Sequence, residues 1–284
     1  MPRGDRRRIA LSGYLDLFGL EPGYPTQHHA AAATSAVAYW AKVSDVEAVL
    51  LTCSCARNQA VPASCVDLAV LVPPGEDERS WHQEMRRFAA FAERDEAIQD
   101  LDAIVPWSAV DLDISTGEFA IPHHGYTTGA DDHEVHIGNL LAWSVPLHTQ
   151  GPRFEELCDQ WLPYYEESVA IERQAMVLGY ARNNLDHVRP YARRGLLFQA
   201  RKRLQDAAEE YLQALFIKHR LYPIAYDKWV AYQLRDVLGA ERILLSLQQA
   251  LGVELTVDGL SRAASLLGEL LDDLAQPATL PTTS

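Results

Sequence analysis

Residues 49–72 read VLLTCSCARNQAVPASCVDLAVLV, and this stretch decides the fold of the first half of the chain. Two apolar runs, 47–52 and 66–72, are typical of buried strands, and Pro73 and Pro74 end the second. Between them lie a short turn with Ser54 and a helical start at Ala56 and Arg57. We therefore expect two sheet strands joined by a tight turn, with Asp67 as a charged residue on the second strand.

The flanking sequence adds helices and a third strand to these two. Residues 26–43 and 79–100 show the composition and spacing of helices. Residues 109–115 alternate apolar side chains with Asp111 and Asp113, which predicts a strand with one polar face. A turn at Thr116 and Gly117 then predicts a return strand over 118–121.

The second half of the sequence is almost wholly helical in pattern. Helical periodicity covers residues 153–181, 193–220, 227–238, 240–251 and 258–275. The break at residues 149–152 predicts a domain boundary, which gives an α/β domain over 1–150 and a helical domain over 151–284. The fold class expected from the whole chain is α+β: a mixed sheet flanked by helices, followed by a helical bundle.

Charge and composition exclude several classes of protein. The 284 residues hold 25 Lys and Arg against 39 Asp and Glu, a net charge of −14, which argues against a duplex-DNA-binding protein. Apolar runs fall short of the roughly 20 residues that a membrane span needs, so we expect no membrane association and a cytoplasmic location. Four cysteines are too few for a disulfide scaffold.

The 49–72 stretch resembles the signature of the DNA polymerase β-like nucleotidyltransferase superfamily. That signature is a strand, Gly-Ser, often Ala-Arg-Gly, about ten residues, and Ser-Asp-x-Asp on the next strand. The matching residues are the apolar strands together with Ser54, Ala56, Arg57, Ser64 and Asp67. An α/β domain followed by a helical domain is similar in plan to the kanamycin nucleotidyltransferase type. Within the helical half, the stretch with Tyr222, Pro223, Lys228 and Trp229 resembles the helical domain of small-molecule nucleotidyltransferases.

The resemblance implies transfer of NMP from an NTP, with ATP expected, to a hydroxyl group of a small-molecule acceptor. It implies that Asp67 binds Mg²⁺ together with a third carboxylate of the family pattern, Asp113 or Asp111, of which we favour Asp113. It also implies that this third carboxylate accepts the proton of the acceptor hydroxyl group. Ser54 and Arg57 would contact phosphate, and Lys228 would reach it as a point charge. It also implies a homodimer. Lys228 has an equally weighted alternative as a surface residue beside a helix stop at Tyr222 and Pro223.

The chain departs from the family pattern at three positions. Cys53 stands in place of the first Gly, Asn58 in place of the second, and Cys65 in place of the first Asp of the paired carboxylates. A thiolate is a poor ligand for Mg²⁺, which prefers oxygen. The alternative function is therefore a nucleotidyltransferase fold that binds a nucleotide, ligand or partner without transfer chemistry.

Two further clusters have competing interpretations. Cys53, Cys55 and Cys65 are either three ligands of a Zn²⁺ site or, as we favour, small buried residues that fill space. Residues 122–136 hold four histidines, among them His133 and His136, and are interpreted as a polar loop near the site rather than as a metal centre.

Overall fold

The computed structural model describes residues 21–75, 78–122, 125 and 128–276. These residues form two compact units. The first comprises the described residues up to Ala120 together with His136–Pro163, and the second comprises those of Ile121–Val135 together with Tyr164 to residue 276. The predicted division at residues 150 and 151 stays a prediction.

The first unit is built on a four-stranded mixed sheet in the order β3-β2-β1-β4. Its strands are β1 (Ala48–Leu51), β2 (Val66–Leu71), β3 (Val110–Ser115) and β4 (Val145–Thr149). β1 pairs antiparallel with β2 and β4, whereas β2 and β3 are parallel. The α+β class expected from the sequence is confirmed, and β4 is a strand that the sequence pattern did not indicate.

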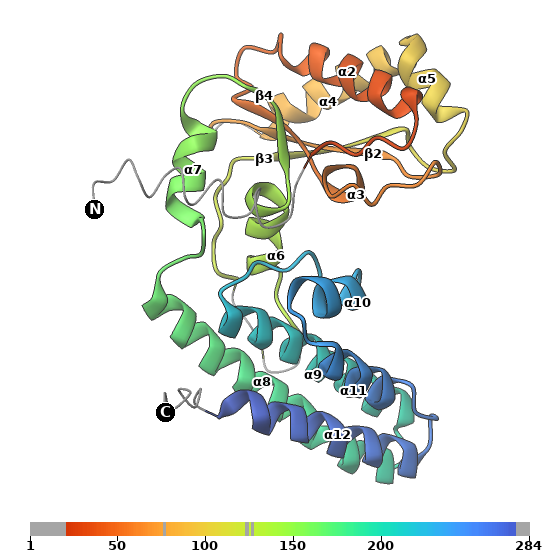
Figure 1. The fold of residues 1–284 in the computed structure, drawn as a ribbon, viewed down its shortest axis with the longest axis vertical. Coiled ribbons are helices and arrows are strands. Elements are labelled where there is room, and N and C mark those ends of the chain that lie inside the picture. The colour runs from red at the N-terminus through yellow and green to blue at the C-terminus, as the bar shows by residue number, and fades with distance from the viewer. Residues whose placement is uncertain (1–20, 76–77, 123–124, 126–127, 277–284) are drawn as a thin grey trace, which may run out of the picture. The chain divides into compact units, whose positions relative to one another are not determined.

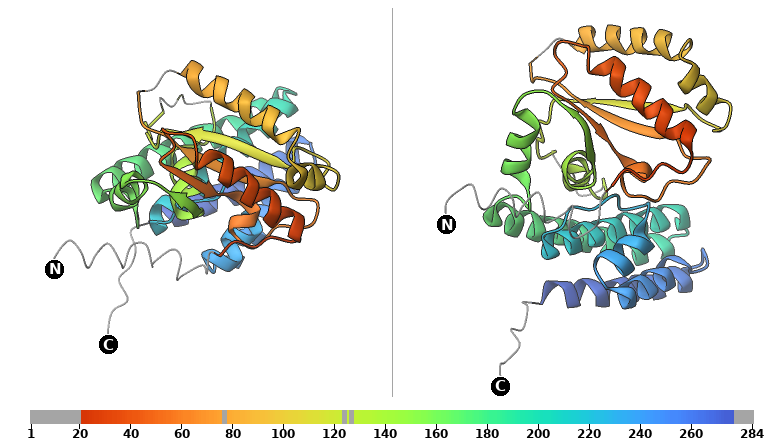
Figure 2. Two further views of the ribbon diagram at one scale, coloured as in Figure 1. Left: turned by 90° about the horizontal axis from the view of Figure 1, so that it is seen from above. Right: turned by 45° about the horizontal axis from the view of Figure 1, so that its top comes forward.

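Helices α2 (Gln27–Trp40), α4 (Glu78–Ala92) and α5 (Glu96–Asp102) cover one face of this sheet (Figures 1 and 2). Val66, Leu68 and Val70 of β2 pack beneath them, and Tyr39, Trp40, Phe88 and Phe91 join in an aromatic cluster. Side chains alternate between the two faces of a strand, so Asp67 lies on the face of the sheet opposite this core.

The predicted return strand over 118–121 is wrong, because the chain has no regular secondary structure there. Gly117 adopts a φ of +70°, and a Cβ on it would lie 2.4 Å from a methyl group of Leu157. Arg153 also donates a hydrogen bond to the Thr116 carbonyl oxygen at 3.2 Å. Both contacts come from α7 (Arg153–Trp161), which therefore packs against the chain directly after β3.

The second unit is helical, and its core is α9 (Leu197–His219), which is buried along most of its length. Around it lie α8 (Glu167–Arg193), α10 (Val230–Tyr232), the π-helix η2 (Gln233–Val237), α11 (Glu241–Leu251) and α12 (Val257–Ala275) (Figure 1). The predicted helix over 153–181 is two helices, separated by a segment that contains Pro163. None of the helices in the described ranges has the length and apolarity of a membrane span.

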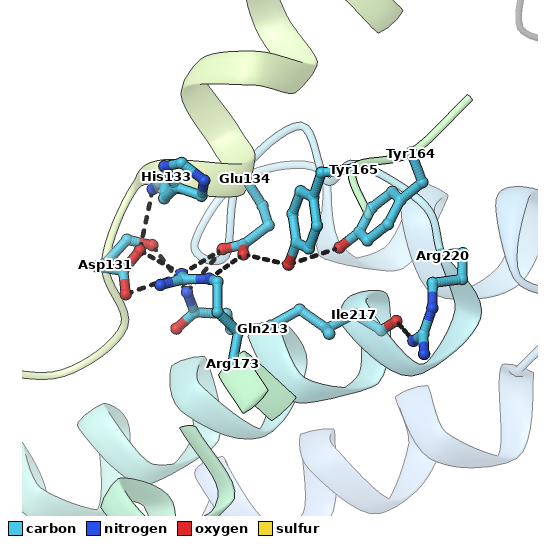
Figure 3. Close-up of polar contacts among 9 residues, drawn as sticks. All are labelled: Asp131, His133, Glu134, Tyr164, Tyr165, Arg173, Gln213, Ile217 and Arg220. Carbon is cyan, nitrogen blue, oxygen red and sulfur yellow. Dashed lines mark hydrogen bonds and ion pairs between the residues drawn. The ribbon is translucent and has the colours of Figure 1, made fainter. Parts of the chain in front are cut away.

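A buried polar cluster joins residues 128–135 to this helical unit. Arg173 of α8 donates to Glu134 from Nε (2.6 Å) and Nη2 (2.8 Å), and to Asp131 from Nη2 (2.8 and 3.0 Å). Tyr165 and Gln213 each donate to Glu134 at 2.8 Å (Figure 3). Glu134 is completely buried, so these donors replace the water that its carboxylate loses.

Replacing Arg173 with Met is expected to lower the free energy of unfolding by about 3–5 kcal/mol, because Glu134 is left as a buried charge without its cation. The matched control is Arg182→Met on the same helix, which breaks an exposed ion pair with Asp272 and should cost less than about 1 kcal/mol. Urea denaturation measures both values. Similar losses in the two variants would contradict this assignment.

Candidate functional site

Three carboxylates lie on the sheet face opposite the apolar core. In the parallel register of β2 and β3, Asp67 is directly opposite Asp111, and Ala69 is opposite Asp113. Alternation along each strand places all three carboxylates on one face. The sheet thus brings together the three predicted metal-binding residues, and the register makes Asp111 the nearer partner of Asp67.

A cleft of about 550 Å³ opens over these carboxylates. Thr52 and Cys53 line one part of it, and Glu118, Phe119 and Asn139 line another. Four carboxylates line the cleft, and no lysine or arginine is among the described residues that do so. The cleft is therefore strongly negative and suited to a cation or to a ligand that brings one.

Part of the cleft wall comes from His136, which lies in a helix rather than in the predicted polar loop, and from residues that the sequence did not single out. α6 (His133–Ile137) contributes His136, and the π-helix η1 (Gly138–Ala142) contributes Asn139 and Leu140. Phe119 packs edge-to-face against Trp161, with ring centroids 5.3 Å apart. The sequence motif over residues 49–72 could not indicate Asn139 or Phe119, because both lie outside it.

The turn between β1 and β2 has glycine-like backbone geometry at both positions where the motif has glycine. Cys53 and Asn58 each have a φ of +54°, in the left-handed region that favours glycine. Cys53 is the first residue of the four-residue helix α3 (Cys53–Ala56), and Asn58 follows that helix by two residues. Asn tolerates this conformation, whereas for Cys53 it costs about 1–2 kcal/mol.

Residues 21–26 pass close against this turn. Gly23 donates its backbone N–H to the Cys55 carbonyl oxygen at 2.8 Å, and a Cβ on Gly23 would lie 2.5 Å from the Cα of Asn58. His29 holds the other side of the motif, with Nε2 2.9 Å from the Ser64 carbonyl oxygen. These contacts fix the loop that leads into β2.

The predicted phosphate-binding residues have different environments. Ser54 is half-buried in α3 and is not among the residues that line the cleft. Arg57 is 7 % exposed and lies near enough to Asp67 for its charge to lower the pKa of that carboxyl group. Lys228 is an exposed residue of the second unit, so its predicted contact with phosphate stays a prediction.

Two other basic residues near Lys228 in sequence already have partners. Lys218 donates to the carbonyl oxygens of Leu274 and Gln276, at the end of α12. Arg220 forms an ion pair with Glu167. Both are therefore occupied in holding helices together.

Burial and the neighbouring Asp111 raise the pKa of Asp67 above its ordinary value, although the Cys65 and Cys53 thiols donate hydrogen bonds to its carboxylate. The bond from Cys65 Sγ to Asp67 Oδ1 is 3.5 Å long. Burial and the charge of Asp67 in turn raise the pKa of Cys65 to about 11. The hydrogen bonds to the ionised Asp67 carboxylate therefore do not fully offset the cost of its burial and of the nearby Asp111.

The cysteines are free thiols. Cys55 is buried and donates to the Cys65 carbonyl oxygen at 3.6 Å. Throughout the part of the chain that the structure describes, no group of three or more His, Cys, Asp or Glu is arranged to hold a metal ion by itself. His133 is buried and His136 lines the cleft, whereas the predicted loop residues His123 and His124 lie outside the described residues.

Comparisons with known proteins give no match. No protein-family model, no curated protein and no solved structure matches the chain.

Replacing Cys53 with Gly is expected to raise the free energy of unfolding by about 1 kcal/mol, because glycine adopts the left-handed conformation without steric cost. The control is Cys55→Gly, at a buried helical position of the same turn, which should lower it by at least about 1 kcal/mol. Chemical denaturation under reducing conditions gives both values. A loss of stability in both variants would show that the turn does not need glycine geometry at Cys53.

Replacing Asp67 with Asn is expected to speed alkylation of Cys65 at pH 8 by up to about tenfold, the change in thiolate population for one pKa unit. The reason is that the charge of Asp67 raises the pKa of this thiol. Mass spectrometry of the peptide that contains Cys65 measures the rate with N-ethylmaleimide. The control, Asp113→Asn, should leave the rate unchanged, and an equal effect of both variants would contradict the pairing of Cys65 with Asp67.

Proposed function

We propose that this protein transfers a nucleoside monophosphate from an NTP, with ATP as the expected donor, to a hydroxyl group of a small-molecule acceptor, using Mg²⁺ and releasing pyrophosphate. The observation that carries the proposal is the facing pair Asp67 and Asp111, beside a turn with two left-handed residues. This combination is what the resemblance to nucleotidyltransferases leads one to expect. The proposal includes a cytoplasmic protein, and the implied homodimer stays a prediction.

The residues in the cleft are chemically suited to Mg²⁺. Asp67 and Asp111 supply oxygen ligands, and Mg²⁺ is commonly held by one or two carboxylates with water and substrate phosphates completing its shell. Burial and the charge of Asp111 raise the pKa of Asp67 despite the nearby Arg57, so a bound metal cation would stabilise the ionised carboxylate. When bound, Mg²⁺ neutralises the charge that develops on the phosphate oxygens during transfer.

Each residue then has a separate role in the proposed reaction. Asp67 and Asp111 hold the metal, and the exposed Asp113, two residues further along β3, accepts the proton of the acceptor hydroxyl group. The contact of Ser54 with phosphate stays a prediction, since Ser54 does not line the cleft. Arg57 is buried near Asp67, and we propose that its charge favours the ionised form of that carboxylate rather than contacting phosphate.

The second candidate function is a protein that binds a nucleotide or another ligand without transfer chemistry. Cys65 favours it, because a thiol occupies the position from which a second carboxylate of β2 would reach the metal. The two candidates differ in whether the cleft binds Mg²⁺ tightly enough for chemistry.

Isothermal titration of the reduced protein with α,β-methylene-ATP is expected to show binding only when Mg²⁺ is present. Asp67→Asn should abolish this binding, since it removes a metal ligand, while the exposed control Asp45→Asn, outside the cleft, should leave it unchanged. Cys65→Asp should raise the affinity for the nucleotide in the presence of Mg²⁺ by at least about tenfold, the effect of one added charged ligand.

Three outcomes of this titration lead to different conclusions. Binding that requires both Mg²⁺ and Asp67 supports transfer chemistry. Nucleotide binding that is indifferent to Mg²⁺ and to Asp67→Asn supports the second candidate. Absence of nucleotide binding under all conditions, in a protein that is folded by circular dichroism, overturns both.

A further inference from the structure

A second cavity, unrelated to the carboxylate cleft, lies within the helical unit. Its volume is about 360 Å³, and its walls come from α9, from residues 226–231 and from α11. Every lining residue belongs to the second unit. The proposed nucleotide chemistry makes no use of this cavity.

Most of the cavity wall is apolar. Ala208 and Leu212 of α9 form one side, and α11 presents three leucines to the other: Leu244, Leu247 and Leu251. Ala231 of α10 lines the cavity and is exposed to solvent. Water in contact with such walls is poorly hydrogen-bonded, so an apolar group that displaces it is stabilised.

Two acidic side chains interrupt the apolar wall. Glu209 of α9 and Asp227 line the cavity, and no lysine or arginine is among its described lining residues. Glu209 accepts a hydrogen bond from Gln205 at 2.8 Å, which is a neutral donor. The nearby Lys202 forms its own ion pair with Asp206 at 2.5 Å, so its charge is already matched.

Gln205 and Lys202 do not balance the negative charges of Glu209 and its neighbours Asp206 and Asp227. Burial and the charges of Asp206 and Asp227 raise the pKa of Glu209, against the opposing effects of Gln205 and Lys202. A cation placed beside Glu209 and Asp227 would remove this repulsion and gain charge-assisted hydrogen bonds. An anionic ligand would add to the repulsion, and a neutral one would leave it as it is.

We propose that this cavity binds a small organic cation, an ammonium group that carries an apolar chain or ring. The ammonium lies between Glu209 and Asp227, and the apolar part lies against the leucines of α11. The site takes its ligand by charge and apolar contact together, so neither an inorganic cation nor a neutral hydrocarbon satisfies both parts of the wall.

The test compares three probes that share one apolar chain: hexylammonium, hexanol and hexanoate. Isothermal titration of the full-length protein at pH 8 is expected to give hexylammonium an affinity at least about tenfold higher than hexanol, the usual effect of hydrogen bonds to a charged group. Hexanoate should bind more weakly than hexanol. Equal affinities for the three probes, or no binding of hexylammonium, would overturn the proposal.

Three variants locate the binding. Glu209→Gln should reduce hexylammonium affinity to that of hexanol, because it removes the charge and keeps the side-chain shape. Ala231→Phe should abolish binding of hexylammonium and hexanol alike, because the ring fills the cavity from its solvent side. Glu241→Gln, an exposed carboxylate of α11 outside the cavity, is the matched control and should change neither affinity.

These variants also separate specific binding from general attraction to an acidic protein. Thermal unfolding confirms that each variant is folded before titration. If Glu241→Gln weakens binding as much as Glu209→Gln, or if Ala231→Phe leaves binding intact, hexylammonium binds elsewhere and the proposal fails.

Discussion

The pairing of β2 with β3 is the interaction on which the rest of the first unit depends. Val66, Leu68 and Val70 bury one face of β2 beneath α2, α4 and α5, and this burial leaves Asp67 only the other face. The parallel register then places Asp111 opposite Asp67. A shift of one residue in either strand would bury a carboxylate in the apolar core. The packing of the core therefore also fixes the position of the carboxylates in the cleft.

Two residues that line the cleft lower the stability of the folded chain. Asp67 is held where burial and Asp111 disfavour its charge, so its folded-state pKa is raised, and stability decreases as pH rises through the range in which it ionises. Cys53 adds the steric cost of a left-handed backbone. These local costs lie together in one turn and one strand, whereas the surrounding sheet is apolar and well packed. Such a concentration is typical of a site kept for binding or catalysis.

In the helical unit, the buried charge of Glu134 is stabilised by hydrogen-bond donors and a cation. Glu134 is surrounded by donors from Arg173, Gln213 and Tyr165, so its carboxylate is compensated at full burial. Glu209, by contrast, has a neutral donor and two nearby carboxylates. The difference explains why the Glu134 cluster is interpreted as structural and the Glu209 cavity as a place for a ligand.

The sequence by itself determined the strands over 47–52 and 66–72, the polar face of β3 and the helical second half, because each follows from the local period of apolar residues. It also placed Asp67, Asp111 and Asp113 on predicted strands, and the resemblance to nucleotidyltransferases made them candidate metal ligands. Only the tertiary structure decided that Asp111 faces Asp67, that Phe119 and Asn139 complete the cleft, and that residues 128–135 belong to the helical unit. Those features depend on register and on partners such as Arg173, about 40 residues from Glu134, and no local period encodes a contact at that distance.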